Sequence, residues 1–309
     1  MAGILVYSDK TSYALELITA AQLIAKDMGL PVQVVSINHV EQATELAKRV
    51  DTYKIDNAAI NLADTAAVAS ALKQAANQLS ANIVLLSSNR RGREIAGRLA
   101  QSLNAGCLSD VNSLKVNSGK IECLRNALGG ATVANQVIEV ENQVITIMPK
   151  VFEQAAEAGG CRLSELVVEV KAGLKVLEVK VKGGDSVDIE AAEILVAVGQ
   201  GMENQGDLAK VEAIAKALGG EVACTKPVST DKKWLSQERI IGLSGKKCKP
   251  SLAILMGISG QVQFTVGIRD AKTIVVINND ENADIMKMAD YAMVADLEDA
   301  IPELLKCLG

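Results

Sequence analysis

Aromatic residues are scarce in this sequence, which has two phenylalanines, four tyrosines and one tryptophan among 309 residues. The core must therefore be built from aliphatic side chains, a composition typical of parallel sheets that are buried on both faces. An excess of basic charge is also lacking, because 32 lysines and arginines stand against 37 acidic residues. This balance argues against a general nucleic-acid binder, which needs a basic stripe.

The sequence also lacks cysteines and histidines at the close spacing that metal-binding motifs require. The six cysteines are widely spread and form no CxxC pair, and His39 is the only histidine. Zinc-ribbon and iron–sulfur frameworks are therefore disfavoured. A chain of this length does not depend on disulfides, so we expect reduced thiols and a cytoplasmic location. The first residues lack the basic and apolar regions of a signal peptide and are expected to form a strand.

One uncharged stretch, Pro250–Ile268, is nearly long enough to cross a bilayer. Small and amide side chains interrupt its middle, among them Gly257, Gly260 and Gln263. We therefore expect a strand, a turn and a helix there, and no membrane span.

Short aliphatic runs alternate with amphipathic stretches over the first hundred residues. This alternation predicts strands joined by right-handed helical crossovers in a mostly parallel sheet. The expected strands are Ile4–Tyr7, Val32–Ile37 and Ile83–Leu86, and the expected helices run from Thr11 or Ser12 to Met28 and over Glu41–Arg49, Ala66–Leu79 and Arg91–Leu103.

After Cys107 the pattern changes to extended segments joined by tight turns, which predicts antiparallel strands added to the first domain. The run from Gly183 to Ser186 is the best candidate for a linker, so the expected domains are residues 1–183 and 184–309. The fold class is α/β, with an N-terminal nucleotide-binding-like domain and a C-terminal doubly wound domain. The extended segments are Asn112–Val116, Ile121–Leu124, Thr132–Val140, Val144–Met148 and Val176–Lys182.

In the second domain, five aliphatic runs each end in small or polar residues. The carboxyl ends of parallel strands lie along one edge of the sheet, so all five clusters are expected to face one crevice, where open α/β sheets bind ligands. The five runs are Ile194–Val198, Val222–Cys224, Leu252–Met256, Thr273–Ile277 and Ala292–Ala295.

The polar clusters also limit the classes of ligand and reaction that the second domain can support. A helix opening at Ser259-Gly260 would offer free N–H groups to a phosphate. A nicotinamide dinucleotide site is disfavoured, because Gly199-x-Gly201 lacks a third glycine and Thr225-Lys226 stands where an acid is needed. The sequence contains no P-loop and no GxSxG nucleophile elbow. No set of base, nucleophile and orienting group can be assembled, which points to chemistry carried by a cofactor.

Three segments of the second domain, Leu252–Gln263, Lys272–Asp280 and Ala289–Leu297, closely resemble the α subunit of electron transfer flavoproteins. The segment Ala223–Val228, together with Trp234, Glu238-Arg239 and Ile241–Gly245, resembles the branch associated with nitrogen fixation, carnitine and anaerobic acyl-CoA metabolism. The resemblance continues more loosely in the first domain, through Asn89–Gly92, Asp110 and Arg125 with Gly129-Gly130.

The resemblance implies an electron carrier with FAD in the second domain, paired with a β subunit and serving an acyl-CoA dehydrogenase or similar redox partner. Bifurcation of electrons stays open, because it depends on a second flavin held largely by the other subunit. The residues that the resemblance places at the cofactor are Gln200, Thr225, Lys226, Ile241, Gly242, Leu243, Ser244, Ser259, Gly260, Gln261, Val262, Gln263, Phe264, Asn278, Asp296 and Leu297.

Four of these residues depart from the family pattern. Gln200 falls where the family usually has an arginine near the cofactor, and Thr225 takes the place of a serine. Lys226 stands where the family usually has an arginine, and it keeps the charge without the planar fork. Phe264 replaces a histidine that can hydrogen-bond the flavin in many relatives. We expect FAD binding to be retained with shifted reduction potentials, because the charge on reduced flavin responds to nearby donors and cations.

Some alternatives remain at this stage. The cluster Arg90, Arg91 and Arg93 is expected at the interface with the partner subunit, and a phosphate patch is the other interpretation. Cys224 is expected to be an inert residue at a strand end, although a redox-sensitive thiol beside a cation has the same sequence signature. The alternative function is a nucleotide-binding module without redox activity, based on the α/β pattern of the first domain.

Overall fold

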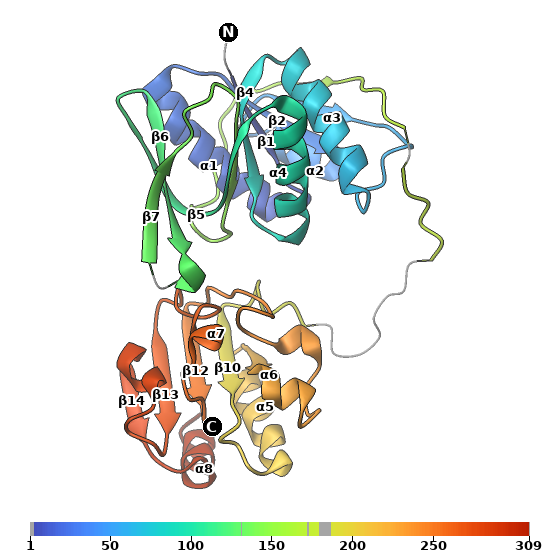
Figure 1. Cartoon of the computed structure of the whole chain (residues 1–309). Helices are drawn as coiled ribbons and strands as arrows, with labels where there is room; N and C mark the ends of the chain where they lie inside the picture. Colours follow the sequence, from blue (N-terminus) through green and yellow to red (C-terminus); the bar gives the residue numbers. More distant parts are fainter. Residues whose placement is uncertain (1–2, 131, 172, 179–186, 309) are drawn as a thin grey trace. The chain divides into compact units, whose positions relative to one another are not determined.

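The computed structural model describes residues 3–130, 132–171, 173–178 and 187–308. The chain divides into two compact units, Met1–Val179 (unit 1) and Lys180–Gly309 (unit 2) (Figure 1). The predicted linker, Gly183–Ser186, lies outside the described residues, and the predicted boundary after residue 183 stays a prediction.

Unit 1 is built on a sheet with the strand order β7-β6-β5-β8-β4-β1-β2-β3-β9. The strands from β8 to β9 in this order run parallel to their neighbours, whereas β6 is antiparallel to both β5 and β7. Its elements are β1 (Gly3–Tyr7), α1 (Thr11–Met28), β2 (Val32–Ile37), α2 (Val40–Leu46), β3 (Thr52–Ile55), α3 (Thr65–Gln78), β4 (Ala81–Ser87), α4 (Arg90–Leu103), β5 (Gly106–Asn117), β6 (Lys120–Ala127), η1 (Leu128–Gly130), β7 (Thr132–Val137), β8 (Gln143–Ile147) and β9 (Leu163–Glu165).

Helices cover both faces of this sheet. Alternate residues of a strand point to opposite faces. In β1, Ile4 and Val6 pack with α1, whereas Leu5 and Tyr7 pack with α3 and α4. Both faces of the central strands are therefore buried, which is why their sequences are continuous aliphatic runs.

The predicted elements of unit 1 need three corrections. Val144–Met148 was expected among the antiparallel strands, but β8 lies parallel between β4 and β5, where its residues Val144–Ile147, apolar except for Thr146, are buried. The predicted strand Val176–Lys182 is wrong for Val176–Glu178, which have no strand structure, and its remaining residues are not described. The short strands β3 and β9 were missed, because four and three residues give too little pattern.

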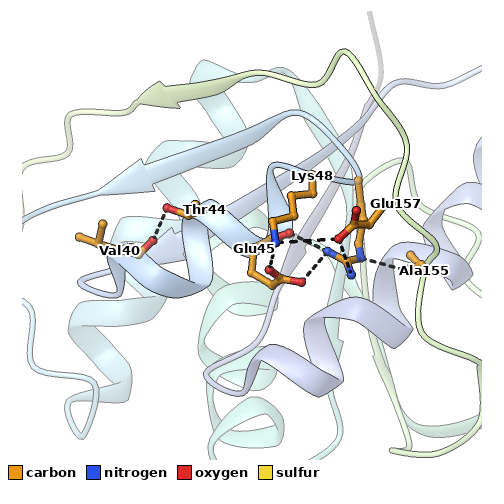
Figure 2. A network of polar contacts seen from close by, with 7 residues as sticks. Val40, Thr44, Glu45, Lys48, Ala155 and Glu157 are labelled. Carbon is orange, nitrogen blue, oxygen red and sulfur yellow. Dashed lines mark hydrogen bonds and ion pairs between the residues drawn. The ribbon is translucent and has the colours of Figure 1, made fainter.

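A polar network fastens the segment after β8 to the end of α2 (Figure 2). Arg49 donates through Nε to the carbonyl oxygen of Ala155 at 2.8 Å and through a terminal nitrogen to Glu45 Oε1 at 2.8 Å. Lys48 contacts Glu45 at 2.7 Å and Glu157 at 3.8 Å. The two cations lower the pKa of Glu45, with the hydrogen bond from Lys48 as the main cause. This network positions the chain for its return towards β9.

Asp64 fastens a second segment, at the start of α3. The carboxylate, which is buried, accepts hydrogen bonds from the backbone N–H groups of Ala66 and Ala67, each at 3.1 Å. It also accepts from the N–H groups of Gly173 and Leu174, at 3.1 and 3.0 Å. These donors stabilise the charged form, so the pKa of Asp64 is lowered, chiefly by the Ala67 N–H.

We expect Asp64→Ala to lower the free energy of unfolding of unit 1 by about 1–2 kcal/mol, because a helix cap is lost and buried donors are left unpaired. Urea unfolding measures the effect, and Asp56→Asn, on an exposed carboxylate paired with Lys54, is the control with little change. The folded pKa is depressed, so this stabilisation is present at neutral pH and declines as the pH falls through the folded pKa. Equal stabilities of parent and Asp64→Ala at pH 7 would contradict the assignment.

Unit 2 contains a five-stranded sheet, all parallel, with the order β11-β10-β12-β13-β14. The chain leaves β10 for β11 on one side and later crosses to β12 on the other, so the topological switch point lies between β10 and β12. The elements are β10 (Ile194–Val198), η2 (Gln205–Asp207), α5 (Leu208–Ala217), β11 (Glu221–Cys224), α6 (Lys226–Thr230), η3 (Gln237–Arg239), β12 (Leu252–Met256), α7 (Val262–Thr265), β13 (Ile274–Asn278), η4 (Asp284–Met288), β14 (Tyr291–Val294) and α8 (Leu297–Leu308).

The two faces of this sheet are covered differently. On one face, α5 and α8 pack against residues such as Val196 and Met256. On the other face, the cover consists of irregular chain and two short helices, with Ile241, Phe264 of α7 and Ile285 of η4 packed against the strands. The stretch Pro250–Ile268 forms β12 and the four-residue α7 as predicted. In the described part of the chain, no helix combines the length and the apolar composition needed to cross a membrane.

Candidate functional site

A cavity of about 680 Å³ lies at the carboxyl ends of the strands of unit 2, at the switch point. This position and this volume are those expected for a ligand site in an open α/β sheet. The loops after β10, β11, β12 and β13 all reach it, together with the segment 241–244. Of the predicted site residues, those that line it are Gln200, Thr225, Lys226, Ile241, Leu243, Ser244, Ser259, Gln261, Gln263, Phe264 and Asn278.

Parallel pairing brings these residues together. Val198 is in register with Cys224 and with Met256, so the residues that follow these three positions leave the sheet side by side. Thr225 N–H donates to the carbonyl oxygen of Val198 at 3.0 Å, which continues the pairing beyond the last strand residue. The predicted convergence of the polar clusters is confirmed for the first four strands.

The segment 241–246 reaches the cavity from outside the five strands. Ile241 N–H donates to the carbonyl oxygen of Cys224 at 2.9 Å, and Leu243 N–H donates to that of Gln263 at 2.7 Å. Leu243 is 63% exposed although it lines the cavity, so it forms part of the rim. These backbone contacts place Ser244 between the end of β11 and α7.

The predicted helix start at Ser259-Gly260 is wrong. Helix α7 begins at Val262 and has four residues, which is too short to provide a strong dipole at the cavity. Gly260 has a φ of +88°, and a Cβ there would lie 2.2 Å from the backbone nitrogen of Ile285. Its missing side chain therefore accommodates η4. Gly242 and Gly260, in loops around the cavity, and Val262, the first residue of α7, do not line it.

Asn278 is a buried residue of the cavity wall that links two loops of the site. This residue is 7% exposed, and its Nδ2 donates to the carbonyl oxygen of Ile258 at 2.8 Å. Its Oδ1 accepts from the N–H of Asp280 at 3.1 Å. The amide thus connects the loops after β12 and β13, so its position in the cavity wall also has a structural cause.

A second cavity, of about 310 Å³, adjoins the first, and Gly201 and Gly257 line both. It contains the remaining predicted residues, Asp296 and Leu297, at the start of α8. Its wall is acidic, and Asp296 accepts a hydrogen bond from Asn279 Nδ2 at 3.0 Å. The other acidic residues in this wall are Glu203, Asp207, Glu298 and Asp299.

Sequence reasoning missed several cavity residues. Gly201 and Gly257 belong to two of the polar clusters identified in the sequence. Their place between the two cavities depends on the contact between the loops after β10 and β12. Asp280 ends the polar cluster after the fourth aliphatic run and also ends a segment used for the resemblance, so the sequence carried two signals for it, although a solvated loop was the preferred interpretation of this acid and its neighbours. The other missed residues are Pro227, Ile258 and Ala283.

One buried polar atom in the wall of the larger cavity, a threonine hydroxyl oxygen, makes no hydrogen bond in the described part of the chain. Among the described residues, Thr225 Oγ1 has no hydrogen-bond partner although the atom is buried. A buried hydroxyl in this condition costs free energy unless a water or a ligand completes it. Thr225 lines the larger cavity, so its hydroxyl is available to form a hydrogen bond with a polar ligand there.

Cys224 is fully buried at the end of β11. Burial raises the pKa of this thiol to about 12, and the nearby Arg239 lowers it only slightly. A raised pKa leaves almost no thiolate at neutral pH, and the thiolate is the reactive form. The inert interpretation of Cys224 is therefore favoured over a redox-sensitive thiol.

We expect alkylation by iodoacetamide at pH 8 to modify Cys307, which is exposed, and to leave Cys224 unmodified in the native protein. At four pH units below its pKa, roughly 1 in 10,000 Cys224 side chains is a thiolate. Peptide mass spectrometry measures the labelling, and the urea-unfolded protein, in which both cysteines react, is the control. Labelling of native Cys224 at the rate of Cys307 would show that the site is open.

The corresponding edge of the sheet in unit 1 is filled by side chains that pair with one another. Asp9, after β1, accepts from Asn89 Nδ2 at 2.8 Å and from Arg91 at 3.2 Å. Ser8 and Ser87 share a hydrogen bond of 2.9 Å. A phosphate placed between these strands would meet the Asp9 carboxylate, so this edge does not favour a nucleotide.

The fold and the two adjoining cavities define an α/β protein with a dinucleotide-type site at the switch point of its C-terminal sheet. The model of the electron transfer flavoprotein FAD-binding domain matches residues 188–269, and that of the electron transfer flavoprotein domain matches residues 8–172. Protein FixB of Escherichia coli O1:K1 / APEC is 32% identical over 317 aligned residues, which cover 98% of this chain and 97% of that protein. Protein FixB of E. coli O127:H6 (strain E2348/69 / EPEC) gives the same identity and coverage.

The chain belongs to the electron transfer flavoprotein family, as an α subunit. Its cofactor is FAD. Family members of this kind normally pair with a β subunit. The resemblance inferred from the sequence is confirmed for the family and for the cofactor.

Proposed function

We propose that this chain carries electrons between a dehydrogenase, of the acyl-CoA type, and a downstream acceptor, with FAD in the two adjoining cavities of unit 2. Bound FAD supplies the electron transfer, and the protein supplies binding, orientation and charge. The observation that supports this site most strongly is the cavity at the switch point, where Thr225 contributes a buried hydroxyl without a partner in the described structure.

The two cavities suit the two ends of a dinucleotide. The larger one is bounded by apolar side chains such as Ile241, Ile258 and Phe264 and by a few polar ones, which fits the ring system of a flavin. The smaller one is acidic, and carboxylates accept hydrogen bonds from sugar hydroxyl groups and from an adenine amino group. We therefore assign the adenosine end to the wall that contains Asp296 and Leu297.

Lys226 is the cationic residue of the larger cavity's wall, and its side chain is exposed. A cation there favours a negatively charged reduced flavin. Phe264, which is 6% exposed, adds an apolar surface instead of a donor and works in the opposite direction. These two residues therefore shift the reduction potential of the bound flavin in opposite directions.

The cluster Arg90, Arg91 and Arg93 in unit 1 is assigned to the interface with the β subunit. Arg91 and Arg93 lie at the start of α4, are about half exposed, and are each held by one carboxylate, Asp9 and Asp110. Preorganised, exposed guanidinium groups are enriched in protein interfaces. A cytoplasmic location is kept as a prediction, supported by six free cysteines.

Purification together with the β subunit tests the proposal. The complex should be yellow, should bleach with dithionite, and should release FAD on denaturation. Counting flavins per heterodimer then separates a single-flavin carrier from a complex that holds a second flavin. A colourless protein that takes up no added FAD but is stabilised by ATP would favour the nucleotide-binding module instead.

A further inference from the structure

Lys232, just beyond α6, is tied to a loop on a different strand. Its Nζ donates to the carbonyl oxygen of Gln200 at 3.1 Å and to that of Met202. The same ammonium lies 4.3 Å from the ring centroid of Trp234, which is a cation–π distance. The ammonium therefore joins the end of α6 to the loop after β10.

That loop separates and borders both cavities. Gln200 lines the larger one, Met202 lines the smaller one, and Gly201 lines both. Gly201 N–H donates to the carbonyl oxygen of Gly257 at 2.9 Å, so the loop also touches the turn after β12. A shift of Gln200 or Met202 changes the shape of both cavities.

The two ends of this connection are anchored. Met202 is 2% exposed and packs in the core with α5, and Trp234 packs on the same core. The backbone N–H of Trp234 also donates to the carbonyl oxygen of Val228 at 3.1 Å, which holds the backbone of this residue against α6. Lys232 itself is absent from both cavity walls, so it acts on them through the loop.

We infer that Lys232 is a positioning residue for the cofactor site: its ammonium, held on Trp234, fixes the loop 199–203 in the shape that both ends of FAD require. This inference rests on the proposed location of FAD. Hydrogen bonds from a charged donor are the stronger kind, and two of them on one loop restrict its movement. The ring of Trp234 restricts the ammonium in turn.

The test compares Lys232→Met with Lys233→Met in the full chain co-purified with its β subunit. Lys233 is exposed and one residue away, so the control removes the same charge from the same segment. We expect Lys232→Met to raise the Kd for FAD about tenfold and Lys233→Met to change it less than about twofold. Lys232→Arg, which can donate to two carbonyls and stack on an indole, should restore the Kd to within about threefold.

Hydrogen exchange of residues 199–203 reports on the loop without FAD. We expect these amides to exchange about tenfold faster in Lys232→Met than in Lys233→Met. Equal exchange in these two variants overturns the inference, and so does an unchanged Kd for FAD in Lys232→Met. If the parent binds no FAD while the exchange rates still differ, the proposed function fails and the connection through Lys232 stands.

A second variant covers the case in which Lys232→Met does not fold. Trp234→Leu keeps both hydrogen bonds of Lys232 and removes the ring below the ammonium. We expect it to raise the Kd for FAD about threefold and to accelerate exchange at residues 199–203. A Trp234→Leu protein that matches the parent in both measurements contradicts the inference.

Discussion

Gly242→Ala is expected to weaken FAD binding about 100-fold. Gly242 has a φ of +131°, and a Cβ there would lie 2.4 Å from the carbonyl oxygen of Gln263. Backbone strain of this kind costs about 1–3 kcal/mol, and overpacking costs a similar amount. The segment 241–246 must shift to relieve the contact, which moves Leu243 and Ser244 in the cavity wall. Titration of the apoprotein with FAD, followed by flavin fluorescence, measures the loss.

Gly219→Ala provides the matched control. Gly219 also has a positive φ, +71°, but no atom lies within 4 Å of the place of its Cβ, and it follows α5 away from both cavities. We expect this variant to lose some stability and to bind FAD like the parent. If Gly242→Ala, folded by circular dichroism, also bound FAD like the parent, the segment 241–246 would not belong to the site.

Lys226→Ala is expected to make the two-electron reduction potential of the bound flavin more negative by roughly 20–40 mV. A unit charge about 8 Å away contributes about 2 kcal/mol at an effective dielectric constant of about 20, and about 1.4 kcal/mol corresponds to about 30 mV. The side chain is exposed, so solvent screening reduces the full value. Spectroelectrochemical titration of parent and variant measures the shift.

Lys216→Ala is the control for charge alone. Lys216 lies in the last turn of α5, whereas the loops at both cavities precede that helix or follow other strands. We expect the flavin bound to Lys216→Ala to have the same reduction potential as the flavin bound to the parent. The Lys226→Ala shift should also shrink as salt is added, because exposed charges are screened. A Lys226→Ala potential equal to that of the parent would mean that this lysine is placed wrongly.

The location of the site followed from the sequence because it depends on a local pattern. An aliphatic run followed by small and polar residues marks a buried strand and its carboxyl end, and parallel pairing then forces such ends together. For this reason the sequence alone predicts that Thr225, Ser259 and Asn278 lie at one site, and all three line the larger cavity. The family resemblance supplied the cofactor, which no pattern of strands could have identified.

The parts that escaped prediction depend on contacts between distant segments. Gly260 lacks a side chain because η4 packs directly against it. The hydrogen bond from Lys232 to Met202 joins residues 30 positions apart. The parallel direction of β8 depends on the neighbours β4 and β5, since its apolar run alone cannot distinguish the two directions. The start of helix α7 was misplaced because a helix of four residues carries too little periodicity to locate it.

Hydrogen exchange of the full chain with and without FAD measures most directly whether the strand ends of unit 2 receive the flavin nucleotide. Slower exchange on FAD addition is expected in residues 199–203, 241–246 and 257–264 and in the loop after β13, with exchange unchanged in unit 1 near Asp9. Protection confined to unit 1, or unchanged exchange in all four loops at saturating FAD, would contradict the account.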